Sequence, residues 1–288
     1  MDLKVRILLE AAVQNRIGSG MAASFGKIDS LLNHGETHDF YVGRESHLAS
    51  SGLVTAETIF DLASLSKVLA TTLLAMKQVE TGKISLDQGI RQYLPDYVSQ
   101  NAGTEAVTLR NLLTHSSGLP AWRPFYEALK DRFGSNLPWV GLDQRIQFFD
   151  QELDRVPLEN PVGEKIVYSD LGFLLLERIL SPDFNQDVSA LWRQVSELKL
   201  HYRPVVSDAL SERVRIQNRG ESVAMTEYCP WRGLLQGQVH DDNCWSRGGV
   251  GGHAGVFGTL ADLKHWIRGL FSEAFVSLKT LREFSTEF

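Results

Sequence analysis

The longest apolar run of the chain covers residues 60–80 and reads FDLASLSKVLATTLLAMKQVE. From Val68 onward its apolar residues occupy almost every face of a helix, a pattern typical of a buried helix rather than a surface one. Ser64 and Lys67 stand three residues apart at its start. We therefore expect a buried helix that begins near Ser64, with both polar side chains on one face of its first turn.

The first 60 residues predict one helix followed by short strands. One helical face collects the apolar residues Leu3, Ile7, Leu8 and Ala11. Two β-favouring runs then flank residues 33–35, Asn-His-Gly, which predict a hairpin turn. The run VTAETIF, residues 54–60, predicts a strand that leads into the buried helix.

Helical patterns dominate the middle of the chain, from about residue 120 to 215. The clearest are LGFLLLERIL and VSALWRQVSELKL, and before them TLRNLLTHSSGLP predicts a short helix capped near Thr108. Residues 229–259 are rich in glycine, and two further helical patterns follow them. Thr259 with Asp262 predicts a capping box for the first of these two helices.

Composition narrows the class of protein. The 288 residues are 43% hydrophobic with a net charge of −6, which suits one large domain or two closely packed ones. The chain has no cluster of basic residues of the kind that predicts nucleic-acid binding. No apolar stretch approaches the ~20 residues that a membrane-spanning helix needs. Cys229 and Cys244 form neither a disulfide framework nor a zinc-ligand spacing, so we interpret them as reduced thiols.

The N-terminus does not have the pattern of a signal peptide. Its apolar run, Ile7–Leu9, ends at Glu10, far short of the apolar region that such a peptide needs. We therefore expect the chain as given to be cytoplasmic, or periplasmic if a leader was removed.

Ser64 and Lys67 are candidates for nucleophilic catalysis. A serine hydroxyl is a weak nucleophile until a base takes its proton, and a lysine can be that base only after losing its own proton. Burial and the positive end of a helix both make the ammonium form costly. The alternative is a structural N-cap serine beside a lysine that extends to solvent.

Spacing alone does not decide between these readings, because Ser-x-x-Lys occurs three times: Ser24/Lys27, Ser64/Lys67 and Ser196/Lys199. The first pair lies in a predicted strand, where positions i and i+3 face opposite sides. The third lies in a predicted amphipathic helix with a solvent-facing lysine. Only the second stands where a strand meets a buried helix.

Four segments together resemble one known family. FDLASLSKVLATT, TLRNLLTHSSGLP and YSDLGFLLLERI resemble the serine β-lactamase and penicillin-binding-protein superfamily, most closely its class-C-like branch of β-lactamase-related esterases and D-aminopeptidases. GQVHDDNCWSRGGVGGHAGVFGTLADLKHW resembles a segment of one subgroup of that branch. The resemblance runs from about residue 15 to 270.

The resemblance implies an α+β fold, in which an antiparallel sheet flanked by helices joins a mainly helical domain, as in β-lactamases and transpeptidases. We expect a single β-lactamase-like domain over residues 1–288. Its α/β part would cover about 1–85 and 216–288, and its helical part about 86–215.

The resemblance also implies roles for matching residues. Ser64 would be the acylated nucleophile, Lys67 its proton partner and Tyr168 a second general base. Asp170 stands where the family usually has asparagine, in a substrate-binding position. While ionised it cannot donate a hydrogen bond to a substrate amide, and it would hold Lys67 protonated. We expect no cofactor and no metal.

Other residues invite different interpretations. His115 beside a serine suggests part of a catalytic triad, but the resemblance implies a structural turn at the edge of the site. Residues 240–242, His-Asp-Asp, suggest a metal site, yet adjacent ligands without a partner cluster favour hydrogen bonds that shape a loop. GGVGGHAG lacks the ending of a phosphate-binding loop, so its glycines are better explained by close backbone approach.

One motif of the family is missing. A Lys-Thr-Gly or His-x-Gly strand should follow the helix after residue 259, and residues 253–255, His-Ala-Gly, come too early to be that strand. The resemblance implies a five-stranded antiparallel sheet built from both chain ends. We find only its N-terminal strands, so we expect the last three strands and the closing helix to be absent. A truncated chain, or pairing of exposed edges in a homodimer, would account for this.

Two functions of different kinds follow. The first is a serine hydrolase with an acyl-enzyme at Ser64, acting on a β-lactam, a D-Ala peptide or a small ester. The second is a catalytically weak or inactive β-lactamase-like protein that binds or scaffolds, because the third motif is absent. Loss of one oxyanion donor alone costs about 10²–10³ in rate.

Overall fold

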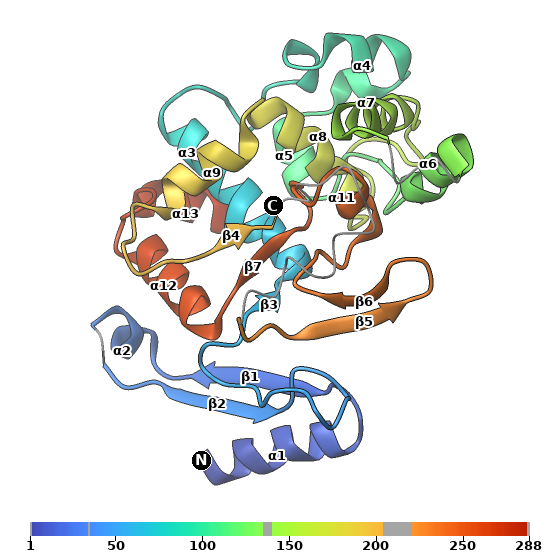
Figure 1. Ribbon diagram of the computed structural model, residues 1–288. Helices are drawn as coiled ribbons and strands as arrows, with labels where there is room; N and C mark the ends of the chain where they lie inside the picture. The colour runs from blue at the N-terminus through green and yellow to red at the C-terminus, as the bar shows by residue number, and fades with distance from the viewer. Residues whose placement is uncertain (1, 34, 135–139, 204–220, 287–288) are drawn as a thin grey trace.

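The computed structural model describes residues 2–33, 35–134, 140–203 and 221–286 (Figure 1). Its N-terminal elements are α1 (Asp2–Gln14), β1 (Gly20–Phe25), α2 (Ile28–Leu32) and β2 (His38–Gly43). The predicted antiparallel pairing of the two strands is confirmed, with Gly20 opposite Gly43. A tight turn at 33–35 is wrong, because α2 lies between the strands and Leu31 is buried where α2 packs on α12; His34 lies outside the described residues.

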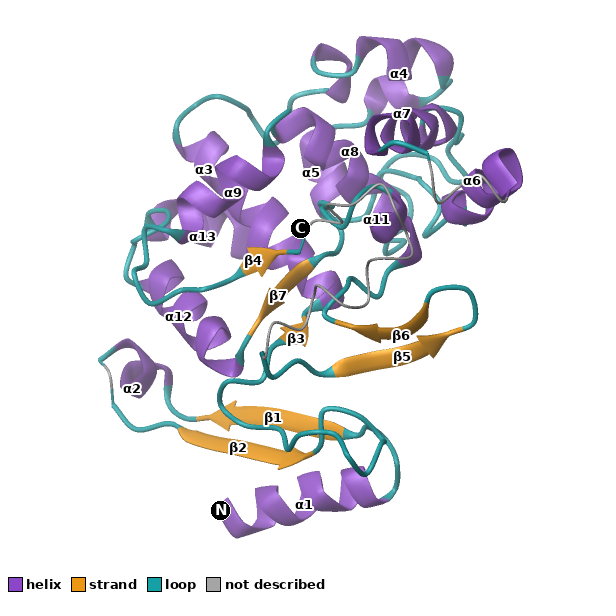
Figure 2. Ribbon diagram, in the orientation of Figure 1, coloured by secondary structure: helices purple, strands orange, loops and turns teal. Residues whose placement is uncertain are grey.

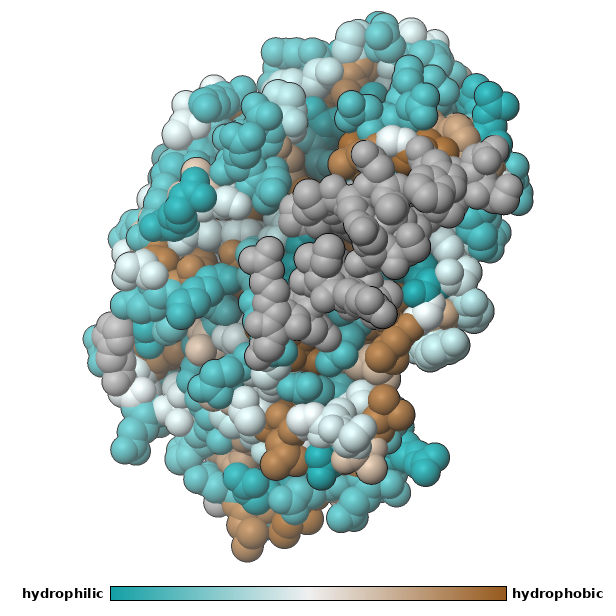
Figure 3. Space-filling model, viewed as in Figure 1, coloured by the Kyte–Doolittle hydropathy of each residue, from teal (hydrophilic) through white to brown (hydrophobic). Residues whose placement is uncertain are grey.

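Helix α1 packs against β2 but buries none of its own residues. Its predicted apolar face is largely exposed, with Leu3 at 70% and Leu8 at 69%. Brown atoms at the lower end of the molecule in Figure 3 lie over this helix.

The remaining strands form two further small antiparallel sheets (Figure 2). Strands β3 (Phe60–Asp61), β7 (Val256–Gly258) and β4 (His201–Tyr202) pair in that order, and β5 (Met225–Cys229) pairs with β6 (Gly233–Gln236). A strand over the whole of 54–60 is wrong, since the Thr58 hydroxyl accepts a hydrogen bond from the Thr55 amide and closes a turn. No described residue after β7 belongs to a strand.

The buried run forms three kinds of helix in succession. A 3₁₀ turn (Ala63–Leu65) leads into a π-helix (Lys67–Thr72), which continues as α3 (Leu73–Glu80). The expected buried helix is present, and its first turns are 3₁₀ and π rather than α. The Leu69 carbonyl accepts hydrogen bonds from the indoles of Trp192 and Trp266 at 3.0 and 3.1 Å, which satisfies it within the widened turn. Such π segments are frequent at functional sites.

Helices gather above the sheets in Figure 1 and are, in chain order, α4 (Pro95–Gln100), α5 (Leu109–Leu113), α6 (Phe125–Phe133), α7 (Leu142–Leu153), α8 (Asp170–Leu180) and α9 (Phe184–Trp192). The cap of α5 at Thr108 is confirmed. The predicted continuation of α9 to Lys199 is wrong. Turns follow Trp192, and the Lys199 amide donates to Asp262 at 2.7 Å, which draws the chain toward α12.

The C-terminal segment carries α11 (Asp242–Ser246), α12 (Leu260–Phe271) and α13 (Leu278–Ser285). The capping box at Thr259 and Asp262 is confirmed. Both cysteines are buried and free. Among the residues with described positions, no helix is long and apolar enough to cross a bilayer. The α+β class is thus confirmed, with helices α3, α8, α9 and α12 enclosing the core around the π-helix.

Candidate active site

Lys67 lies at the centre of the candidate site. Its side chain is 3% exposed, and its Nζ lies 2.6 Å from Asp170 Oδ1. It also donates to Ser64 Oγ at 3.0 Å and to the His253 carbonyl at 3.2 Å. Two hydrogen bonds and one ion pair therefore surround the ammonium with three oxygens.

The backbone before Ser64 is held in an uncommon conformation. Ala63 has φ +45°, in the left-handed region that costs a non-glycine residue free energy. Its amide donates to Asp61 Oδ1 at 2.8 Å, and its carbonyl accepts from the buried Ser66 hydroxyl at 2.6 Å. Burial raises the pKa of Asp61, against hydrogen bonds from the His240 and Ala63 amides. These contacts fix the turn that presents Ser64.

Tyr168 lies next to Lys67 and comes just before α8 in the chain. Lys67 Nζ lies 4.8 Å from the centroid of its ring, and Tyr168 itself is 54% exposed. The ring packs on His115 at a centroid distance of 4.5 Å. His115 Nδ1 accepts a hydrogen bond from the Ser169 amide at 2.9 Å, and burial, followed by the charge of Lys67, lowers the pKa of His115. His115 therefore acts as a neutral support for Tyr168.

The THSSGLP segment also positions Asp170. Ser169 caps α8 by accepting from the Gly172 amide, and its hydroxyl donates to the Pro120 carbonyl at 2.7 Å. The Asp170 amide donates to the Ala121 carbonyl at 2.9 Å. The start of α8 is thus tied to this segment, and the Asp170 carboxylate is directed at Lys67.

The glycine-rich segment forms the third side of the site. The Gly252 carbonyl accepts from the Thr71 hydroxyl at 2.6 Å, and its amide donates to Glu177 at 2.8 Å. A Cβ on Gly252 would lie 2.5 Å from the Phe173 carbonyl. The predicted close backbone approach is therefore confirmed at Gly252, and it brings the His253 carbonyl to Lys67.

Glu177 also anchors this side to the helical part. It accepts both hydrogen bonds of Arg247 Nη1 at 3.0 Å, and Arg247 lies 3.4 Å from Asp150 on α7. The arginine is buried, and the two carboxylates outweigh that burial, so the pKa of Arg247 is raised. The charges are therefore paired inside the protein rather than aimed at a ligand.

The structure brings Ser64, Lys67, Tyr168 and Asp170 together as predicted neighbours. The other two Ser-x-x-Lys pairs are not joined: Ser24 donates to Asp39, and Ser196 to Glu197.

Residues 240–242 point to separate partners. His240 lies 3.4 Å from Glu227, and Asp242 lies 2.8 Å from Arg232. Asp241 bonds the His253 ring. Across the described ranges no group of three His, Cys, Asp or Glu side chains could hold a metal ion. Sequence reasoning set Asp241 and His253 aside; the density of glycines around His253 was the signal that could have placed them near the site.

The family model described as Beta-lactamase matches residues 30–287. The chain belongs to the beta-lactamase family. It is 28% identical over 220 residues to an N-acetylmuramyl-L-alanine amidase of Bacillus subtilis (strain 168), covering 72% of this chain and 48% of that protein. It is 29% identical over 224 residues to a putative D-alanyl-D-alanine carboxypeptidase of Escherichia coli (strain K12), covering 73% of this chain and 50% of that protein.

Solved structures show the same fold. This beta-lactamase-family chain aligns with an octameric penicillin-binding protein homologue from Pyrococcus abyssi at a TM-score of 0.72 and 22% identity, covering 99% of this chain and 60% of that one. It aligns with a class C beta-lactamase from Rhodobacter sphaeroides at a TM-score of 0.65 and 19% identity, covering 97% and 68%. The chain spans about half the length of the curated relatives it matches.

Proposed function

We propose that this chain is a serine hydrolase that forms an acyl-enzyme at Ser64. The observation that carries the proposal is the contact of Ser64 Oγ with Lys67 Nζ at 3.0 Å, at the start of a buried helix. Membership of the beta-lactamase family supports it, because serine acylation is the chemistry that the motifs imply. Ser64 attacks the substrate carbonyl, and its oxygen becomes the ester oxygen of the intermediate.

Lys67 and Tyr168 serve as the proton-transfer groups. Lys67 donates a hydrogen bond to Ser64 Oγ and stabilises negative charge as it develops on that oxygen. The Ser64 proton moves to Tyr168, directly or through Lys67, while the proton that Tyr168 gives up goes to the leaving group. The bond between the carbonyl carbon and the leaving group breaks in the same step, and water later hydrolyses the Ser64 ester. Asp170, at the start of α8, orients Lys67 and contacts the substrate.

The substrate we propose is an amide of a D-Ala peptide or a β-lactam, with small esters as further substrates. The names of the relatives favour peptide amides, since they include a D-alanyl-D-alanine carboxypeptidase and an amidase. The second candidate function is a catalytically weak or inactive protein that binds such ligands. One observation favours it: Asp170 pairs with Lys67 at 2.6 Å, and while ionised it cannot donate the hydrogen bond to a substrate amide that the family's usual asparagine can.

Covalent labelling tests the first proposal. We expect a fluorescent penicillin or a fluorophosphonate to label the wild type, and Ser64→Ala to abolish the label. Ser196→Ala is the matched control, because it removes the serine of another Ser-x-x-Lys pair, one without a lysine contact. Absence of label on the wild type, or equal labelling of Ser64→Ala, sinks the hydrolase proposal. Turnover of nitrocefin or a p-nitrophenyl ester that depends on Ser64 sinks the binding alternative.

A further inference from the structure

Lys67 takes one of its three acceptors from outside the residues assigned above. Asp170 and Ser64 supply side-chain oxygens, but the third acceptor is the main-chain carbonyl of His253, at 3.2 Å. A main-chain carbonyl is placed by whatever holds its residue. The contacts of His253 therefore determine the position of one oxygen that Lys67 Nζ binds.

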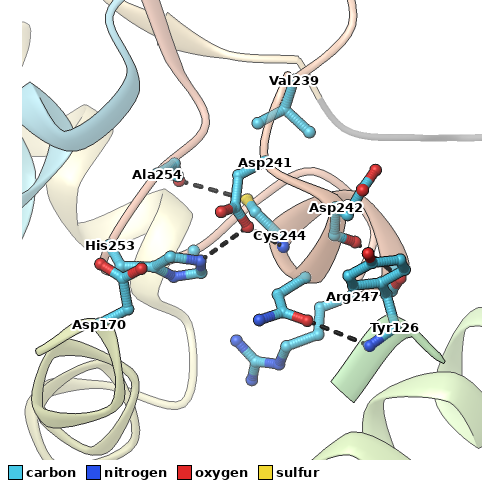
Figure 4. Close-up of polar contacts among 12 residues, drawn as sticks. Tyr126, Asp170, Val239, Asp241, Asp242, Cys244, Arg247, His253 and Ala254 are labelled. Carbon is cyan, nitrogen blue, oxygen red and sulfur yellow. Dashed lines mark hydrogen bonds and ion pairs between the residues drawn. The ribbon is translucent and has the colours of Figure 1, made fainter. Parts of the chain in front are cut away.

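The His253 side chain is buried and is bound to Asp241. It is 1% exposed, and its Nε2 lies 3.0 Å from Asp241 Oδ1 (Figure 4). Asp241 is itself fixed, because the same Oδ1 accepts from the Cys244 amide at 2.6 Å and caps α11. Burial acts to raise the pKa of Asp241, but the charge and hydrogen bond of His253, with the Cys244 amide, bring it to about 2. Asp241 is therefore a carboxylate.

The space around the imidazole is closely filled. A Cβ on Gly251 would lie 3.1 Å from both Cys244 Sγ and His253 Nδ1, so a larger residue there would require these side chains to shift by a few tenths of an ångström. The Cys244 thiol donates to the Ala254 carbonyl at 3.3 Å, the contact drawn beside the His253 ring in Figure 4. In this arrangement Nε2 of the ring is directed at Asp241.

The glycine-rich segment is hydrogen-bonded on both sides of His253 to the helical run over residues 63–80, which we call the nucleophile helix. Before His253, the Gly252 carbonyl accepts from Thr71; after it, the Val256 amide donates to the Ser66 hydroxyl at 3.1 Å. These bonds hold the segment against the helix. The imidazole adds the one side-chain bond at residue 253 itself, and it sets the orientation of that residue relative to α11.

We propose that Asp241 and His253 form a positioning pair, which holds the His253 carbonyl against Lys67 and so keeps Nζ directed at Ser64. The inference rests on the proposed function, because it assigns the pair's purpose to the acylation of Ser64. The pair touches no reacting atom. It acts through Lys67, and displacing reacting groups by about 1 Å can cost as much as 10²-fold in rate.

Three variants of His253 separate positioning from mere packing. Leucine has a similar volume but no N–H. Glutamine and asparagine both carry an amide N–H₂, but only the longer glutamine places it near the Nε2 position, within reach of Asp241. We expect the second-order rate of Ser64 labelling to fall roughly 10- to 100-fold in His253→Leu and His253→Asn, and to return to within about threefold in His253→Gln. Thermal unfolding followed by circular dichroism confirms that each sample is folded.

A second readout does not depend on activity. In protein labelled with ¹⁵N-lysine, a buried ammonium held by hydrogen bonds and an ion pair exchanges its protons slowly with water and gives a sharp Nζ–H correlation, assigned by its loss in Lys67→Arg. We expect this signal in the wild type and His253→Gln, and its broadening in His253→Leu and His253→Asn. If no probe labels the wild type, the proposed function fails, and this signal still decides whether the pair positions Lys67.

The outcomes that overturn the inference are definite. They are a folded His253→Leu or His253→Asn with wild-type labelling and an unchanged Lys67 signal, or a His253→Gln no better than the asparagine variant. Should the leucine variant fail to fold, the comparison of the two amides carries the test, because they differ only in reach.

Discussion

Replacing Asp170 tests the electrostatics of the candidate site most directly. Its carboxylate lies 2.6 Å from Lys67 Nζ, and the two side chains are 19% and 3% exposed. At that separation, with an effective dielectric constant of about 20, their Coulomb attraction is about 6 kcal/mol. Desolvation of both charges offsets part of it, and removing one partner of such a buried pair costs about 3–5 kcal/mol of stability.

We therefore expect Asp170→Ala to lower the free energy of unfolding by about 3–5 kcal/mol. Asp170→Asn keeps an acceptor oxygen, and a hydrogen bond to a charged group contributes about 1.5–3 kcal/mol, so we expect a loss of only about 1–3 kcal/mol. Asp87→Asn is the matched control. Asp87 lies at the same 2.6 Å from Arg110 but is 73% exposed, and such surface pairs contribute about 0–1 kcal/mol.

Urea unfolding at pH 7, followed by circular dichroism, measures all three variants. Labelling by a fluorescent penicillin is then measured on the same samples. The side-chain amide of Asp170→Asn can donate a hydrogen bond to a substrate amide, which an ionised carboxylate cannot, so we expect this variant to be labelled faster than the wild type. The reasoning is refuted if Asp170→Ala loses no more stability than Asp87→Asn, since the pair would then behave like one at the surface.

Two further predictions concern stability. Hydrogen bonds from the Ser277 amide and from Lys77 outweigh burial and lower the pKa of Glu80 from 4.5 to about 2. Its contribution is therefore present above pH 4.5 and lost as the pH falls toward 2, and urea unfolding at pH 7 and pH 3 should show a smaller acid loss for Glu80→Gln. Gly252→Ala should cost about 1–3 kcal/mol, because its Cβ would meet the Phe173 carbonyl. Gly141→Ala, which meets no atom within 4 Å, should change thermal stability far less; equal losses would contradict this account.

The sequence predicted the residues of the candidate site better than the remote contacts that hold them in place. Ser64 and Lys67 were found because a buried apolar run makes two polar residues at its start conspicuous. The π-helix could not be predicted, because the indoles that donate to its Leu69 carbonyl, those of Trp192 and Trp266, are remote in sequence. Local patterns record propensity and periodicity, but not which distant donor reaches a given carbonyl.

The tie between Asp241 and His253 was missed for a related reason. For residues 240–242 the sequence favoured hydrogen bonds that shape a loop over a metal site, but the spacing does not reveal which partner each side chain reaches. The predicted extent of the helix to Lys199 was wrong, because the Lys199 amide donates its hydrogen bond to the Asp262 carboxylate instead of to a helical carbonyl. The predicted domain boundaries and the homodimer stay predictions.

Tryptophan fluorescence can report on the nucleophile helix, because two indoles donate hydrogen bonds to its Leu69 carbonyl. Of the six tryptophans, Trp192 and Trp266 are 2% and 6% exposed, and both donate their indole N–H to that one oxygen. Indole emission shifts to longer wavelength when the ring meets water. Any event that unwinds the widened turn releases both indoles at once. The chain therefore carries a built-in fluorescent reporter on the segment that presents Ser64, one that needs neither dye nor substrate.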